Sequence, residues 1–136
     1  MTTGARVAPV VFLTGASTGI GEALARHYAA QGATLGLVAR RAALLDKVTA
    51  SLPGRHLHYA ADVRDTDALR AAAEDFIARV GVPDVVIGNA GVSVGTLTGE
   101  QEDLPAFEAV FDINVLGLLH TFQPFVQPMI ARGEGR

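Results

Sequence analysis

The chain has 136 residues, of which 49% are hydrophobic and 18% are charged, and its formal net charge is −3. This balance is typical of one packed domain, and it argues against a disordered chain and against a basic nucleic-acid-binding surface. The absence of cysteine excludes disulfides, thiolate metal sites and a cysteine nucleophile. The segment Met1 to Pro9 lacks the features of a signal peptide, and no run reaches the ~18 apolar residues that span a bilayer. We therefore expect a cytoplasmic protein without a nucleic-acid or membrane partner.

Near its start, the chain passes from an apolar run, Val10 to Thr14, into a stretch with glycine at three positions. The run predicts a strand, and the spacing that follows predicts a helix whose buried face carries Ile20, Ala23, Leu24, His27 and Tyr28. In such a unit Gly15 serves a tight turn, Gly19 a close ligand approach and Gly21 close helix packing. The N–H groups and positive dipole end of the helix suit a pyrophosphate. The unit predicts a dinucleotide site, with glycines that serve packing alone as the alternative.

Strands and helices then alternate. The apolar runs 34–39, 57–61 and 85–87 predict strands, and the last of these is apolar on both faces, as in a strand covered on both sides. Helical spacing predicts inward faces made of Leu44, Leu45, Val48 and Leu52, and of Leu69, Ala72, Ala73, Phe76, Ile77 and Val80. Asp65 is the predicted N-cap of the latter helix. This order predicts an α/β fold, a parallel Rossmann-type doubly wound sheet of strand order 3-2-1-4 with helices on both faces.

A long final helix is predicted after the polar loop Ser93 to Glu102. Asp103 is its expected N-cap, and Pro124 and Pro128 are each expected to remove a backbone hydrogen bond and bend it. Helical spacing continues through its apolar positions, which are Val110, Phe111, Val115, Leu118, Leu119 and Phe122.

Arg40 and Arg41 follow the second predicted strand. Arg40 comes nineteen residues after Gly21, where NAD-dependent folds carry an acidic residue for the ribose 2′-hydroxyl. An arginine there suits a 2′-phosphate, which a carboxylate would repel, and Arg41 is placed to assist it. The alternative is a pair of solvated charges, although their sign opposes the dipole at a helix start. We expect NADP(H) to be preferred over NAD(H).

Polar residues also follow the third and fourth predicted strands. Asp62 and Val63 suit an adenine ring, with a simple turn as the alternative for Asp62. Asn89, Ala90 and Gly91 lie at the carboxyl end of a strand, where open α/β sheets bind ligands, although Asn89 can equally brace neighbouring loops. Asn114 interrupts an apolar helical stripe, as an N-cap or kink residue also would. The four histidines lack metal-ligand spacing, and we expect no metal site.

The stretch Thr14-Gly15-Ala16-Ser17-Thr18-Gly19-Ile20-Gly21 resembles the T-G-x-x-x-G-I-G fingerprint of classical short-chain dehydrogenases/reductases (SDR). Asp62-Val63, Asn89-Ala90-Gly91 and Asn114 match further motifs of that family in the same order. The resemblance implies that the loop residues Gly15, Ser17, Thr18, Gly19, Ile20 and Gly21 hold the cofactor. It also implies that Asn114 belongs to the catalytic tetrad. The implied activity is interconversion of an alcohol and a carbonyl on a small molecule. The resemblance also implies assembly into a homodimer or homotetramer through the final helix and the helix that would follow it.

The family's Tyr-x-x-x-Lys pair and serine are not found in this sequence, whose only candidates are Tyr28, Tyr59 and Lys47. The family places that machinery after the position of Arg136. We therefore expect residues 1–136 to be the amino-terminal cofactor-binding part of a longer enzyme, inactive alone, with Val85 to Ile87 as an exposed sheet edge. The loop Ser93 to Glu102 is expected to form one wall of the substrate pocket. The alternative function is a non-catalytic nucleotide-binding or interaction module.

Overall fold

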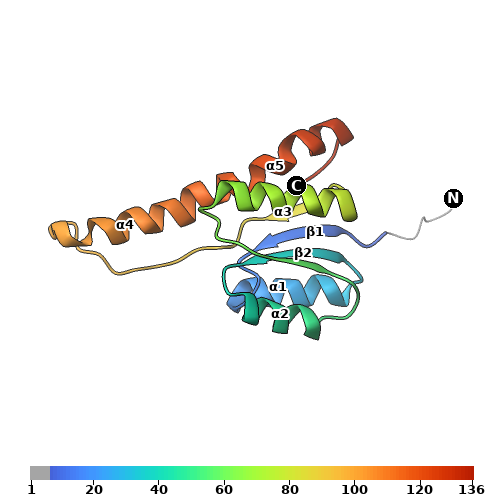
Figure 1. Cartoon of the computed structure of the whole chain (residues 1–136), viewed down its shortest axis with the longest axis horizontal. Helices are drawn as coiled ribbons and strands as arrows, with labels where there is room; N and C mark the ends of the chain where they lie inside the picture. The colour runs from blue at the N-terminus through green and yellow to red at the C-terminus, as the bar shows by residue number, and fades with distance from the viewer. Residues whose placement is uncertain (1–6) are drawn as a thin grey trace.

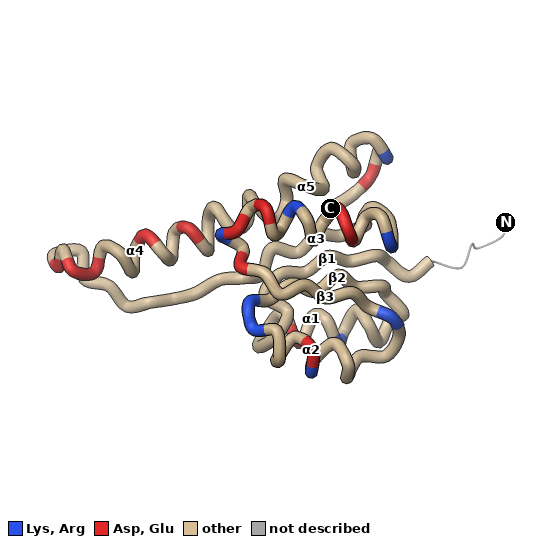
Figure 2. The backbone as a smooth tube through the Cα atoms, in the orientation of Figure 1, with Lys and Arg blue, Asp and Glu red and all other residues tan. Residues whose placement is uncertain are grey.

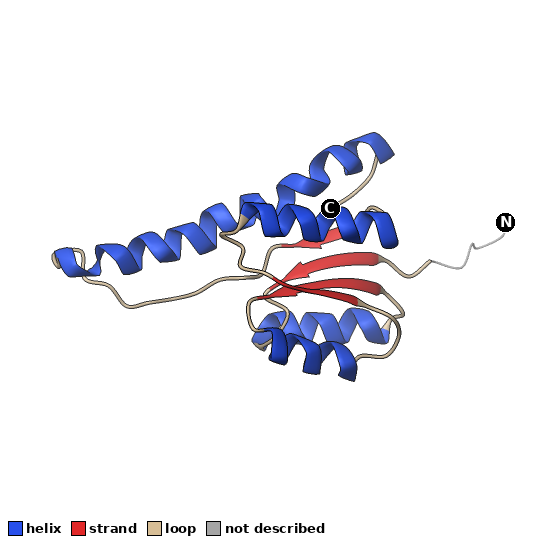
Figure 3. Cartoon of the chain, in the orientation of Figure 1, coloured by secondary structure: helices blue, strands red, loops and turns tan. Residues whose placement is uncertain are grey.

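A computed structural model describes residues 7–136 and contains a four-stranded parallel sheet between two layers of helices (Figures 1 and 3). The strands are β1 (Val10–Thr14), β2 (Thr34–Ala39), β3 (Leu57–Ala60) and β4 (Val85–Ile87). Their order is β3-β2-β1-β4, as the sequence predicts, with Val11 opposite Leu35 on one side and Val85 on the other. Most of the segment Met1 to Pro9 lies outside the described residues.

The helices cover both faces of this sheet. Figure 1 shows α1 (Gly19–Ala30) and α2 (Ala42–Ser51) on one face, and α3 (Thr66–Arg79) and α5 (Gly117–Arg132) on the other. Each face has its own hydrophobic core. Phe12 of β1 is central to the second core, with ring centroids 5.4 Å from Phe76 of α3 and 4.7 Å from Phe125 of α5. These crossover helices allow neighbouring strands to run parallel.

The buried face of α1 differs from the prediction. Ile20 is 73% exposed, and the buried residues are Gly21, Ala25 and Ala29. These small residues recur every fourth position and let the helix backbone approach the sheet closely, which a stripe of larger side chains would prevent. On α2, Leu45 and Val48 are buried as predicted, whereas Leu44 is exposed. The prediction located both helices correctly but put four exposed residues on the buried faces, namely Ile20, Ala23, His27 and Leu44.

The two predicted N-caps have different outcomes. Asp65 caps α3, since its carboxylate accepts a hydrogen bond of 3.0 Å from the backbone N–H of Ala68. Asp103 does not cap the next helix, α4 (Leu104–Phe111), because it already has helical dihedral angles at the end of a 3-10 turn, Gln101–Asp103. Its carboxylate accepts instead from the N–H of Leu97 at 2.7 Å and so closes the preceding loop.

Helix α4 continues into α5 through a π-helical turn, Asp112–Leu116. Pro124 and Pro128 both lie inside α5, which runs on to Arg132, and the irregular turn comes before them. Figure 1 shows α4 extending beyond the sheet, and none of its residues is buried. The helical stretch Gln101–Arg132 is long and apolar enough to cross a membrane, a test that core helices also pass. No segment able to span a bilayer was expected from the sequence, because only uninterrupted apolar runs were counted. Within this stretch, Thr121 and Phe125 are buried in the fold.

Strand β4 lies at the edge of the sheet, where the predicted strand order places it, although its apolar sequence is typical of a strand covered on both sides. The edge is nevertheless not the open apolar surface that was expected. Val85 is buried, and the backbone of Arg136 pairs with the outer side of the strand. The N–H of Arg136 donates to the carbonyl of Asp84 at 3.1 Å, and the N–H of Val86 donates to the carbonyl of Arg136 at 2.8 Å. This pairing satisfies two backbone groups that an edge strand would otherwise expose.

Candidate functional site

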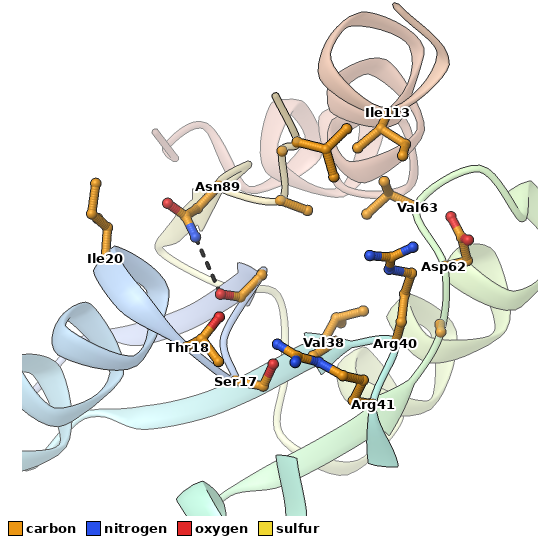
Figure 4. A pocket seen from close by; sticks show the side chains of 16 residues that line it. Ser17, Thr18, Ile20, Val38, Arg40, Arg41, Asp62, Val63, Asn89 and Ile113 are labelled. Carbon is orange, nitrogen blue, oxygen red and sulfur yellow. Dashed lines mark hydrogen bonds between the residues drawn. The ribbon is translucent and has the colours of Figure 1, made fainter. Parts of the chain in front are cut away.

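A cleft of about 300 Å³ opens where the strands end, at the carboxyl edge of the sheet (Figure 4). Eleven of the thirteen predicted cofactor-binding residues line it, namely Gly15, Ser17, Thr18, Ile20, Arg40, Arg41, Asp62, Val63, Asn89, Ala90 and Gly91. Gly19 and Gly21 are not among the lining residues. Parallel strands place the residues that follow them at one edge, and this is why segments distant in sequence converge there.

The glycine turn between β1 and α1 forms one side of the cleft. Gly15 and Gly19 have φ angles of 69° and 57°, in the left-handed region that side chains disfavour. The position that a Cβ would take on Gly19 is open space, whereas one on Gly21 would collide with the carbonyl group of Gly15. The N-cap, Thr18, makes no side-chain capping hydrogen bond to the first turn of α1. These features leave a concave backbone surface and a positive helix end facing the cleft.

Thr14 fastens this turn to the end of β4. Its buried hydroxyl accepts hydrogen bonds from the backbone N–H groups of Asn89, at 3.1 Å, and Ala90, at 3.2 Å. The side-chain amide of Asn89 donates to the carbonyl of Gly15 at 3.2 Å (Figure 4). Asn89 therefore braces the two loops, as one of its two interpretations proposed. Thr14 was not predicted as a site residue, although a polar residue ending an apolar strand was a usable signal.

Arg40 and Arg41 lie in the turn between β2 and α2, which is coloured blue in Figure 2. Both side chains are exposed and border the cleft. In Figure 4 the guanidinium of Arg40 points toward Asp62 and Val63, and that of Arg41 points toward the glycine turn. The first turn of α2 carries no acidic residue. Two cations and a helix N-terminus thus concentrate positive potential at this side of the cleft, which suits an anionic group.

Asp62 and Val63 form the wall of the cleft opposite the glycine turn (Figure 4). The Arg64 guanidinium binds the Asp62 carboxylate and, with the positive charge of Arg40 as a smaller cause, holds the pKa of Asp62 below its usual value. Val63 is buried, and its carbonyl lies 2.8 Å from Nδ1 of His120 on α5. The methyl groups of Val63 also pack against Gly117, where a Cβ would not fit. Helix α5 therefore sets the position of this wall.

Asn114 lies in the π-helical turn and is not among the residues that line the cleft. Its amide forms two hydrogen bonds with the backbone of Val92, which does line it. Neither Tyr28, Tyr59 nor Lys47 borders the cleft. The hydroxyl of Tyr59 donates to Asp75 at 2.8 Å, and burial, followed by this hydrogen bond, raises the Tyr59 pKa well above its ordinary value. The predicted catalytic role of Asn114 stays a prediction.

The remaining walls of the cleft are apolar. They come from five residues that were not predicted for the site, namely Val38, Ala39, Ala61, Val92 and Ile113. In the sequence, Val38 and Ala39 end an apolar strand and are indistinguishable from core residues. The loop 93–102 contributes none of the lining residues. Within residues 7–136, no group of three His, Asp or Glu side chains is placed to hold a metal ion.

Comparisons with known proteins agree with this geometry. The sequence model described as short chain dehydrogenase matches residues 9–136. The chain is 35% identical over 133 residues to 11-beta-hydroxysteroid dehydrogenase A of Sesamum indicum, covering 93% of this chain and 37% of that enzyme. It also resembles the structure of L-sorbose reductase from Gluconobacter frateurii in complex with NADPH and L-sorbose, with 30% identity and a TM-score of 0.85. That match covers 93% of this chain and 49% of the reductase.

A further similar structure is NAD+-bound xylitol dehydrogenase, at 26% identity and a TM-score of 0.86. The match covers 95% of this chain and 51% of that chain. The chain thus spans about half of these two solved structures, of which the reductase holds NADPH and the xylitol dehydrogenase holds NAD+. The comparisons support the fold and a nicotinamide nucleotide in general, and the choice between the two cofactors depends on the residues of this cleft.

Proposed function

The chain belongs to the short-chain dehydrogenase family, and from this premise we propose that it is the amino-terminal, cofactor-binding part of an oxidoreductase that prefers NADP(H). The complete enzyme would interconvert an alcohol and a carbonyl on a small molecule. Its Ser and Tyr-x-x-x-Lys residues would follow residue 136. The lengths of the relatives are consistent with this, because the chain spans half or less of the hydroxysteroid dehydrogenase and of the sorbose reductase.

The observation that carries the cofactor preference is the position of Arg40. It follows directly after β2 and borders the cleft, and no carboxylate occupies that turn. A guanidinium pairs with a phosphate through charge-assisted, often bidentate hydrogen bonds, and a ribose 2′-hydroxyl offers no charge to match it. Arg40 therefore favours the 2′-phosphorylated cofactor.

The other residues of the cleft fit the rest of a dinucleotide. The open space beside Gly19 and the uncapped start of α1 suit a pyrophosphate, which needs N–H donors and close backbone approach. Asp62 is assigned to the adenine amino group, since an ionised carboxylate only accepts hydrogen bonds. Ala90 and Gly91 are assigned to the nicotinamide ribose. When bound, the nicotinamide supplies the hydride donor or acceptor of the reaction.

The test is a binding titration of the full-length protein with NADPH and NADH, followed by turnover of NADPH with a panel of ketones and aldehydes. The proposal expects tighter binding of NADPH and measurable oxidation with at least one carbonyl compound. Binding without turnover across the panel would favour the alternative, a non-catalytic nucleotide-binding module. Tighter binding of NADH would refute the cofactor preference.

We also propose that the complete protein is a homodimer or homotetramer that associates through α4 and α5. Their exposed large apolar residues are Leu104, Phe107, Phe111, Val115, Leu116, Leu119, Phe122, Val126 and Ile130. So continuous an apolar surface marks an interaction site in most proteins. Light scattering tests this proposal, and a monomeric mass for the full-length protein would contradict it. A cytoplasmic location stays a prediction.

A further inference from the structure

Arg64 lies just beyond the cleft wall and holds Asp62 through four hydrogen bonds. Its backbone N–H donates to Oδ1 of Asp62 at 2.9 Å, and its Nε lies 3.1 Å from Oδ1 and 3.2 Å from Oδ2. Its Nη2 donates to Oδ2 at 2.7 Å. Both carboxylate oxygens are therefore occupied by a cation that does not itself line the cleft.

Asp62 also lies within electrostatic reach of Arg40. The charge of Arg40 contributes to lowering the Asp62 pKa, and Figure 4 shows the Arg40 guanidinium pointing toward that carboxylate. Yet within residues 7–136 the ion pair of Asp62 is formed with Arg64, and Arg40 takes part in no ion pair. Arg40 is the other cation whose charge acts on Asp62, so a carboxylate without Arg64 is free to pair with Arg40, and it would repel a phosphate brought into the same cleft.

We propose that Arg64 is a specificity-determining, positioning residue for the 2′-phosphate of an adenine nucleotide. By pairing with Asp62, it keeps that carboxylate from capturing Arg40 and neutralises its charge toward the phosphate. This inference rests on the proposed NADP(H) preference, because it assigns Arg40 to the 2′-phosphate.

The experiment measures binding of 2′,5′-ADP and 5′-AMP to the full-length protein by titration calorimetry. These two nucleotides differ only in the 2′-phosphate, so the ratio of their dissociation constants reports on that group alone. Arg64→Gln is expected to weaken 2′,5′-ADP binding by about 5- to 10-fold and 5′-AMP binding by less than about 2-fold, in the range of single partly exposed charge pairs. Arg64→Lys retains the charge and is expected to keep most of the ratio.

Two further variants test the mechanism. Arg70→Gln removes the same charge from the outer side of α3, where Arg70 pairs with Asp67 at 3.6 Å, and is expected to leave the ratio within about 2-fold. In the Asp62→Asn/Arg64→Gln double variant no carboxylate remains to capture Arg40. The ratio should therefore return toward that of the unaltered protein, as a double-mutant cycle requires for coupled residues.

The inference is overturned if Arg64→Gln weakens both nucleotides equally, which indicates a merely structural role, or if the double variant keeps the defect of the single one. It also fails if Arg64→Gln changes neither constant. If the unaltered protein binds 5′-AMP as tightly as 2′,5′-ADP, the NADP(H) preference is refuted as well. The binding of the unaltered protein thus separates the two proposals.

Discussion

The side-chain amide of Asn114 forms two hydrogen bonds with the backbone of Val92, each 2.8 Å long. The N–H of Val92 donates to Oδ1 of Asn114, and Nδ2 of Asn114 donates to the carbonyl of Val92. This pairing ties the π-helical turn to the loop that follows β4. Gly91 lies against the same amide, since a Cβ there would be 3.3 Å from Oδ1 of Asn114. One side chain thus fixes the path of the segment that forms the inner wall of the cleft.

Asn114→Ala is expected to lower the free energy of unfolding by about 1–3 kcal/mol, because it leaves two half-buried backbone groups without partners. Urea unfolding of the full-length protein measures this cost. Gln127→Ala, which removes an exposed amide from the following helix α5, is the matched control and should change stability by less than about 0.5 kcal/mol. Equal effects of the two variants would show that the Val92 pairing contributes nothing.

Arg40→Asp is expected to weaken NADPH binding by roughly 10- to 100-fold, because it replaces a charge-assisted partner of the phosphate with a repelling carboxylate. NADH binding should change by less than about 3-fold, since NADH carries no 2′-phosphate. Fluorescence titration of both cofactors measures the two constants. Arg55→Asp, an exposed residue before β3 and so near the opposite edge of the sheet, makes the same charge change away from the cleft. Equal losses for both cofactors would refute the assignment of Arg40.

Substitutions of Gly19 and Gly21 are expected to separate binding from folding. Gly19→Ala places a methyl group in open space at a φ of 57°, so it should cost about 1–2 kcal/mol of stability and weaken nucleotide binding about 10-fold or more. Gly21→Ala drives a methyl group into the Gly15 carbonyl and should destabilise the fold by more than Gly19→Ala does. Urea unfolding and titration calorimetry measure the two effects, and the reverse order of stability losses would contradict this model of the turn.

Tyr59 predicts a loss of stability at alkaline pH. Burial and the hydrogen bond to Asp75 raise its pKa in the folded protein, so the folded state holds the phenol proton where the unfolded chain, with a pKa near 10.0, releases it. The contribution of Tyr59 to stability is complete below pH 10.0, and it is lost as the pH rises from there toward the folded pKa. Unfolding free energies measured between pH 8 and 11 should fall less steeply for Tyr59→Phe. An identical slope for the two proteins would contradict the prediction.

Much of the fold follows from local patterns along the chain. Strands and helices alternate at spacings that a parallel sheet requires, and the order β3-β2-β1-β4 matches the prediction. The Asp65 cap was likewise predictable, because it depends on residues only three positions apart. The prediction that Ile20 faces inward was wrong, because hydrophobic spacing alone does not show that Gly21, Ala25 and Ala29 let the helix approach the sheet closely.

The sequence by itself determined most of the residues that reach the cleft, because parallel strands bring the residues after β1, β2, β3 and β4 to one edge. Only the tertiary structure decided how those residues are held. Thr14 binds Asn89 across 75 positions of the chain, and His120 contacts Val63 across 57. Such partners are chosen by distances of about 3 Å, which depend on the packing of whole helices and leave no periodic trace in a sequence.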